Sequence, residues 1–185
     1  MNKRIIQWFD HAVAATSLRG FLQNPKRILK KYVRPGLTVL DVGAGEGYFS
    51  LAMARMVGSR GRVMAVDLQA EKLDLLRARA VEAGMGEGIE TRVCTERSLN
   101  IDDYAGWFDF ALACYVVHHA ADVEALMGEV YKALKPGGEF FIIEPGHHAS
   151  PKEIDAIEAA AQRAGFMIID RRRLISNRGI LLGKS

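Results

Sequence analysis

A glycine-rich turn between an apolar run and an amphipathic segment constrains this chain more than any other feature. Residues 39–50 read Val-Leu-Asp-Val-Gly-Ala-Gly-Glu-Gly-Tyr-Phe-Ser, so an apolar run carrying Asp41 is followed by glycines at 43, 45 and 47. This order predicts a buried strand, a tight turn and then a helix. Proteins of the α/β class use that arrangement to bring bare backbone against a nucleotide-like ligand.

A second apolar run also ends in an acid. It covers residues 62–67 and ends at Asp67, 24 residues after Gly43. A carboxylate at the end of the neighbouring strand can accept hydrogen bonds from both hydroxyls of a ribose. The two segments together predict an adenosine-type cofactor.

The spacing of the glycines distinguishes between such cofactors. In the dinucleotide fingerprint G-x-G-x-x-G the third glycine lets the helix pack closely, and the helix N-terminus faces a pyrophosphate. Tyr48 stands at that third position here. Its bulk disfavours a close pyrophosphate and suits a ligand without phosphate, such as S-adenosylmethionine. An NAD(P)-dependent oxidoreductase is the alternative that Tyr48 disfavours.

With these features, the chain resembles the class I S-adenosylmethionine-dependent methyltransferases, in particular the methyltransferase type 11 family. Four blocks carry the resemblance, which covers about residues 36 to 145: Asp41–Gly47, Asp67, Phe108–His119 and Leu134–Pro145. It implies in-line transfer of a methyl group from S-adenosylmethionine to a small-molecule acceptor. A non-catalytic S-adenosylmethionine-binding protein is the remaining alternative, because the same motifs would serve it.

Length and composition indicate one globular domain. The chain has 185 residues, of which 49% are hydrophobic and 25% are charged. No apolar run approaches the roughly 20 residues that span a bilayer. Cys94 and Cys114 lack metal-type spacing and favour a reducing, cytoplasmic location. The net charge of +3 is too small to indicate a nucleic-acid partner.

Strands and helices alternate along the chain, which predicts a doubly wound, mostly parallel α/β sheet. A reverse turn is expected at residues 177–179, and the resemblance adds that the last two strands form a hairpin in a seven-stranded Rossmann-like sheet. The expected strands are Thr38–Val42, Arg62–Asp67, Glu90–Cys94, Phe108–Cys114, Glu139–Glu144, Phe166–Leu174 and Gly179–Gly183. The expected helices are Lys26–Val33, Tyr48–Val57, Ala70–Ala83, Asp122–Leu134 and Pro151–Ala164.

We divide this single methyltransferase domain into three parts. We expect residues 1–35 to form an N-terminal helical extension, 36–145 the cofactor-binding core, and 146–185 a C-terminal helix with the closing strands. Apolar residues recur at helical spacing within 1–22. We interpret the extension as a lid that sets acceptor choice, so its deletion should abolish turnover and leave cofactor affinity largely intact.

The resemblance places the cofactor contacts just after each strand. The amino-acid half of the cofactor would lie on the glycine turn, its ribose would bind Asp67, and Leu68 would cover one face of its adenine. The loop after the third strand would pass the adenine, and the end of the fourth strand would pass the methionine part. The alternative to cofactor binding at these positions is a purely structural role, as a tight turn, a helix cap, a solvated loop or a packing residue. The complete set is Asp41, Gly43, Gly45, Gly47, Tyr48, Asp67, Leu68, Glu96, Arg97, Cys114 and Tyr115.

Two histidine pairs follow neighbouring strands of the expected sheet. His118 and His119 come after the fourth strand, and His147 and His148 after the fifth. Methyl transfer to a hydroxyl or an acidic carbon requires removal of a proton, and a histidine titrates in the right range for that role. We therefore assign His118 as the general base. Histidines of a helix start or of the surface are an equally good interpretation.

Other chemistries fit the residues less well. Glu144 with the histidines would offer metal ligands, but adjacent histidines rarely chelate one ion, and no metal site is predicted. Arsenite methylation favours several thiolates, and the chain has two cysteines. Residues 114–117 lack the Asn-Pro-Pro-aromatic motif of enzymes that methylate adenine amines. Basic clusters within 26–34 and 171–178 are solvated faces or docking sites for an anionic acceptor or RNA, and the absence of interleaved aromatics weakens the RNA interpretation.

Overall fold

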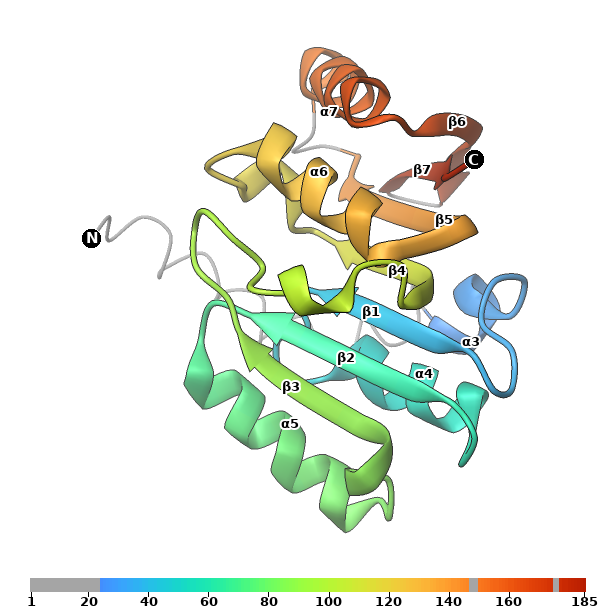
Figure 1. Cartoon of the computed structure of the whole chain (residues 1–185), viewed down its shortest axis with the longest axis vertical. Coiled ribbons are helices and arrows are strands. Elements are labelled where there is room, and N and C mark those ends of the chain that lie inside the picture. The colour runs from blue at the N-terminus through green and yellow to red at the C-terminus, as the bar shows by residue number, and fades with distance from the viewer. Residues whose placement is uncertain (1–23, 147–149, 175–176) are drawn as a thin grey trace.

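In the computed structural model the chain forms one seven-stranded sheet with helices on both faces (Figure 1). The structure describes residues 24–146, 150–174 and 177–185; the helix expected within 1–22 and the pair His147–His148 lie outside them. The strand order is β3-β2-β1-β4-β5-β7-β6. The strands are β1 (Thr38–Val42), β2 (Arg62–Asp67), β3 (Ile89–Val93), β4 (Phe108–Cys114), β5 (Leu134–Pro145), β6 (Met167–Leu174) and β7 (Asn177–Gly183).

Strands β1 to β5 are parallel, and β7 runs antiparallel to both β5 and β6. This confirms the expected mostly parallel sheet with an antiparallel strand in its C-terminal hairpin. The helices are α3 (Pro25–Leu29), α4 (Tyr48–Val57), α5 (Ala70–Glu82), α6 (Val123–Ala133) and α7 (Pro151–Ala164). Three 3-10 turns complete the described elements: η1 (Gly86–Gly88), η2 (Asp102–Tyr104) and η3 (Val117–His119).

Local capping explains where several helices begin. Asn24 caps α3 by accepting from the Arg27 amide, and Asp122 caps α6 in the same way. Helix α7 begins with a capping box in which the Ser150 hydroxyl and the Glu153 carboxylate each accept from the other residue's backbone amide. Such boxes satisfy two amides that the helix itself leaves without partners.

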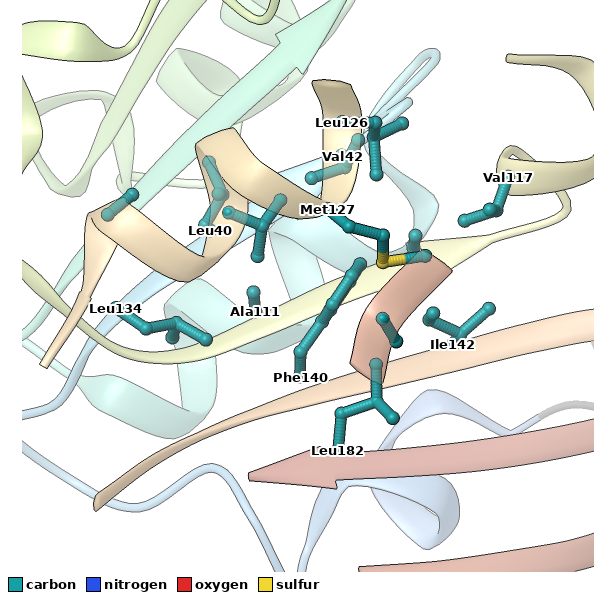
Figure 2. Packing of buried hydrophobic residues seen from close by; sticks show 14 of the residues in the cluster. Leu40, Val42, Ala111, Val117, Leu126, Met127, Leu134, Phe140, Ile142 and Leu182 are labelled. Carbon is teal, nitrogen blue, oxygen red and sulfur yellow. The ribbon is translucent and has the colours of Figure 1, made fainter. Parts of the chain in front are cut away.

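Alternate residues of the central strands enter two separate cores. Phe140 and Ile142 of β5 pack beneath α6 and α7, whereas Phe141 and Ile143 pack beneath α3, α4 and α5. Figure 2 shows the first of these cores, where Met127 and Leu126 lie over the strands. Because both faces are covered, the central strands are apolar nearly throughout. Each fully buried large apolar side chain contributes about 1.5–3 kcal/mol.

The reverse turn expected at residues 177–179 is wrong. Asn177 and Arg178 lie in β7, paired with Pro145 and Glu144 of β5, and residues 175–176 between β6 and β7 lie outside the described part. A Cβ on Gly179 would lie 2.9 Å from Phe141 Cε2, so this glycine allows close packing against the core. Sheet pairing and packing override the local turn preference of the Asn-Arg-Gly sequence.

Other boundaries differ by a few residues. Helix α3 ends at Leu29, well before Val33. The Lys-Pro-Gly-Gly segment after α6, expected as a loop, begins strand β5, because Leu134 pairs with Phe108 before the register shifts. None of the described helices is both long and apolar enough to cross a membrane.

The crossovers place a topological switch point between β1 and β4. The segment after β1 leads to α4 on one face, and the segment after β4 leads to α6 on the other. Figure 1 shows β1 and β4 side by side at the centre of the sheet. Ligands of doubly wound folds bind at the carboxyl ends of the strands at such a point.

Candidate functional site

The glycine turn lies at this switch point and is held against the end of β2. The Gly43 and Ala44 amides donate to the Val66 carbonyl at 2.8 and 3.0 Å. Gly43 has a φ of +71°, and a Cβ there would lie 2.2 Å from Val116 Cγ2 in the segment after β4. The turn thus needs glycine at 43 for its conformation and for the close approach of two strand ends.

Asp67 ties this turn to β2. The Gly45 amide donates to Asp67 Oδ2 at 2.8 Å, and the Gln69 amide donates to Oδ1 at 2.9 Å. The Asp67 side chain is mostly buried, with 8% of the residue exposed. A carboxylate has about four lone-pair positions, so each oxygen retains capacity for a further donor. A Cβ on Gly45 would meet nothing within 4 Å, so the backbone borders open space beside this carboxylate.

Asp41 is buried under the same turn. Its Oδ2 accepts from the Ser50 hydroxyl of α4 at 2.5 Å. Burial raises the pKa of Asp41 to about 7; the Ser50 hydrogen bond opposes this rise and the nearby Asp67 charge adds to it. Since only 2% of Asp41 is exposed, its carboxylate lies inside the fold, under the glycine turn. Glycine 47 caps α4 with no side-chain hydrogen bond, so the N-terminus of that helix opens onto the turn.

A second charged centre links the ends of β4 and β5. His118 Nδ1 contacts Glu144 Oε2, and the Val117 and His118 amides donate to Glu144 Oε1 at 3.0 and 3.3 Å. The two side chains are nearly inaccessible, at 7% exposed for His118 and 0% for Glu144. His118 Nε2 is buried and has no hydrogen-bond partner among the described residues. The His119 ring packs on the His118 ring with centroids 3.8 Å apart.

Tyr115 connects the end of β4 to the closing hairpin. Its φ is +62°, which is uncommon for a residue with a side chain. Its hydroxyl donates to Asn177 Oδ1 of β7 at 2.7 Å. Cys114, just before it, is partly buried and packs against the core beneath α4 and α5. These positions lie on the same strand edge as the glycine turn.

The remaining predicted cofactor residues lie at the rim. Tyr48 and Leu68 are half exposed, at 47% and 51%. Glu96 and Arg97 lie on an exposed turn closed by Thr95, whose hydroxyl accepts from the amides of Arg97 and Ser98. The fold therefore brings the turn, Asp67 and the β4 end to one edge, while Glu96 and Arg97 belong to its outer loop.

Several features lie away from this edge. Two cavities, of about 310 and 250 Å³, border Lys132 and Pro136 near the opposite ends of the strands. No cluster of three potential metal ligands occurs within the described ranges. Burial raises the pKa of the Cys94 thiol to about 11, which disfavours a reactive thiolate. Arg171 and Arg172 each pair with a carboxylate at 2.7 Å, of Glu158 and Asp170, so both of these cations are already engaged.

Sequence reasoning missed three partners that the fold supplies. Ser50 binds Asp41, Val116 covers Gly43, and Asn177 binds the Tyr115 hydroxyl. The sequence pattern offers Glu144 only as a possible metal ligand and does not indicate its contact with His118. A charged residue at the end of an otherwise apolar run was the one available signal for Glu144.

The chain is similar to known methyltransferases. A family model described as "Methyltransferase domain" matches residues 40–142. The chain is 31% identical over 150 residues to the ubiquinone/menaquinone biosynthesis C-methyltransferase UbiE of Cellvibrio japonicus, and 28% identical over 158 residues to the protein of that name from Hahella chejuensis. These alignments include 77% and 81% of this chain, but only 59% and 63% of those relatives.

A solved structure shares most of this fold. It is a SAM-dependent methyltransferase from Aquifex aeolicus, with a TM-score of 0.80 and 22% sequence identity. The match covers 90% of this chain and 93% of that one. At this level of identity the likeness shows the fold.

Proposed function

This chain belongs to the methyltransferase domain family, and on that premise we propose that it transfers a methyl group from S-adenosylmethionine to a small-molecule acceptor. The observation that carries the proposal is the Gly45–Asp67 hydrogen bond, which holds an open glycine turn beside a buried carboxylate at the switch point. Family membership favours this activity over the nicotinamide-dependent alternative.

The residues at this edge fit S-adenosylmethionine. Asp67 would accept from the ribose hydroxyls with its remaining lone pairs. The backbone of 43–47 and the N-terminus of α4, where the N-cap Gly47 supplies no side-chain hydrogen bond, would face the cofactor's carboxylate, because a helix N-terminus favours negative charge. Exposed Leu68 would cover one adenine face. The remaining contacts we assign are Asp41 beneath the turn, Tyr48, Glu96 and Arg97 at the rim, and Cys114 and Tyr115 along the methionine part.

The chemistry requires little beyond placement and a proton acceptor. S-adenosylmethionine, when bound, supplies a methyl group on a positively charged sulfur. The chain's contribution is to hold the acceptor in line with that methyl group, and such orientation contributes roughly 7–11 kcal/mol. We assign His118 as the group that takes the acceptor's proton, because its ring already contacts the buried carboxylate of Glu144.

We base the proposed class of methyl acceptor on the names of the relatives. Two of them are named as C-methyltransferases of ubiquinone and menaquinone biosynthesis. We propose a small organic acceptor that is methylated at carbon or oxygen, with residues 1–35 setting its identity. The deletion of residues 1–20 should then abolish turnover and leave S-adenosylhomocysteine binding intact; unchanged turnover would argue against this role. In this proposal the enzyme acts in the cytoplasm without a nucleic-acid partner.

Thermal unfolding with four ligands in parallel tests the cofactor. A ligand at 100 times its dissociation constant stabilises the folded state by about 2.7 kcal/mol, which at this length shifts Tm by roughly 5–10 °C. We expect S-adenosylmethionine and S-adenosylhomocysteine to shift Tm, and NAD and NADP to leave it unchanged. A shift with a nicotinamide alone would overturn the proposal.

An activity screen separates an enzyme from a binding protein. The readout is S-adenosylhomocysteine formed from S-adenosylmethionine in the presence of pooled small molecules. Formation that depends on one pool identifies the acceptor class. Binding without formation in any pool would favour a non-catalytic role.

A further inference from the structure

We propose that Glu144 is a positioning residue that fixes the tautomer of His118, so that Nε2 takes a proton from a hydroxyl or acidic-carbon acceptor. The inference rests on the proposed methyl transfer and adds to it a residue and a substrate class. It depends on the contacts that surround Glu144, which the sequence does not place together.

The hydrogen bonds at Glu144 Oε1 come only from donors. Its Oε1 faces two backbone amides, of Val117 and His118, and both can only donate. These donors favour the ionised carboxylate, since a hydrogen bond to the charged form stabilises it. The carboxylate is fully buried, so it retains these partners without competition from water.

The charge state of Glu144 in turn defines the tautomer of His118. An ionised carboxylate only accepts, so the Nδ1 atom that contacts Oε2 must carry a proton. In the neutral imidazole the lone pair then lies on Nε2. This atom is buried without a partner among the described residues, which is costly for a polar atom, and a catalytic role is one recognised explanation of such a group.

Surrounding groups complete the electrostatic setting. Within the described part of the chain, the groups that face His118 are Glu144 from β5, His119 from the same turn and Glu153 from α7. Glu153 is engaged in the capping box of α7, where its hydrogen bonds with Ser150 hold its pKa below the usual value. Glu144 is therefore the carboxylate in direct contact with the ring in the described part of the chain.

The atoms and charges of the methyl-transfer step balance when His118 accepts the proton and Glu144 pairs with the resulting imidazolium. The acceptor's proton passes to His118 Nε2, the acceptor atom bonds to the methyl carbon, and the carbon–sulfur bond breaks with its electron pair left on sulfur. The sulfur loses its positive charge, and the imidazolium that forms is paired with the Glu144 carboxylate. Release of the proton to water restores the neutral ring. Only an acceptor that must lose a proton benefits from this arrangement.

Replacement of the Glu144 carboxylate by an amide tests its positioning role and leaves the His118 ring in place. Glu144→Gln retains the shape and one carbonyl oxygen, but its NH₂ group would face Nδ1 and favour the opposite tautomer. The first readout is the ¹⁵N NMR spectrum of histidine-labelled protein saturated with S-adenosylhomocysteine, with the His118 signals assigned from His118→Gln. We expect the proton on Nδ1 in the wild type and on Nε2 in Glu144→Gln.

The second readout is methyl transfer to a panel of phenols, 1,3-dicarbonyl compounds and alkylamines. We expect turnover with phenols or dicarbonyls, and a loss of about 10²–10⁴-fold in kcat for Glu144→Gln and His118→Gln. S-adenosylhomocysteine affinity should be unchanged. Glu153→Gln is the matched control, because it removes a nearby carboxylate that does not touch the ring, and it should retain both the tautomer and the turnover.

The outcomes separate this inference from the proposed function. Absence of S-adenosylhomocysteine binding to the wild type would defeat both. Normal binding with an Nε2-protonated His118 in the wild type, an unaltered tautomer in Glu144→Gln, or methylation of alkylamines only would overturn the role of Glu144. If no compound of the panel is methylated, the tautomer measurement decides for or against the positioning role.

Discussion

The Gly45 amide donates a 2.8 Å hydrogen bond to Asp67 Oδ2, which joins the turn after β1 to the last residue of β2. The two residues are 22 positions apart in the chain and meet because β1 and β2 are adjacent and in register. The same carboxylate thus orders the turn and remains available for a ligand. If the cofactor binds as proposed, this contact couples its affinity to the shape of the turn.

Replacement of Asp67 by alanine should therefore weaken cofactor binding in two ways. It removes the acceptor proposed for the ribose hydroxyls and releases the Gly45 amide. Hydrogen bonds to a charged group contribute about 1.5–3 kcal/mol each, so the dissociation constant of S-adenosylhomocysteine should rise at least about tenfold. Isothermal titration calorimetry measures this change directly.

Asp74→Ala serves as the control for Asp67→Ala. Asp74 is an exposed acid of α5 that pairs with Arg77 on the surface. Its loss should leave cofactor affinity unaltered. If Asp67→Ala bound as tightly as Asp74→Ala, the ribose acceptor would have to be another residue.

An alanine at Gly43 should destabilise the fold more than one at Gly84. Both positions have positive φ, +71° and +68°, so both substitutions carry the left-handed strain of about 1–2 kcal/mol. Only at Gly43 would the Cβ collide with a neighbour, at 2.2 Å from Val116 Cγ2, whereas Gly84 faces open space. Urea unfolding should show the larger loss for Gly43→Ala.

A double variant tests the cause of that difference. Val116→Ala removes the two methyl carbons that the new Cβ would meet. We expect Gly43→Ala/Val116→Ala to be less destabilised than the sum of the two single variants, because the collision is gone. Additive losses would show that backbone strain alone limits position 43.

The stability of the protein should depend on pH through Asp41. Its pKa rises from 3.8 to about 7 on folding, so the folded protein holds this proton more tightly than the unfolded chain. The contribution is therefore present below about pH 4 and is lost as pH rises to about 7. At about 1.36 kcal/mol per pKa unit, ionisation of the buried acid costs up to about 4 kcal/mol.

Asp41→Asn removes this cost and retains an acceptor for Ser50. The free energy of unfolding of the variant relative to the wild type should rise between about pH 4 and pH 7, as measured by urea denaturation across that range. Asp74→Asn, on the exposed face of α5, should show no such trend. A constant difference for Asp41→Asn would mean that Asp41 ionises at its ordinary pKa.

The capping box of α7 predicts a local effect on stability. Ser150→Ala removes the hydroxyl that accepts from the Glu153 amide, and loss of an N-cap costs about 0.5–2 kcal/mol. Ser59→Ala, at an exposed turn, is the matched control and should change the free energy of unfolding much less. Equal effects in thermal unfolding would show that the box contributes nothing measurable.

Most elements of the fold could be read from local pattern. Strands β1, β2 and β4 and helices α4 and α7 begin and end at the residues expected from apolar runs, glycines and caps. Errors occurred where tertiary contacts compete with local preference. Asn177 and Arg178 read as turn residues before the last strand, yet they belong to β7 and pair with Pro145 and Glu144 of β5.

The sequence by itself determined the order of elements, the glycine turn and the acid that ends β2, because these depend on neighbours within a few residues. Only the tertiary structure decided which side chains share an environment. Asp41 has a raised pKa because strands and α4 bury it, and His118 meets Glu144 across 26 residues because β4 and β5 pair. Burial and long-range contact are properties of the packed sheet, and no local pattern contains them.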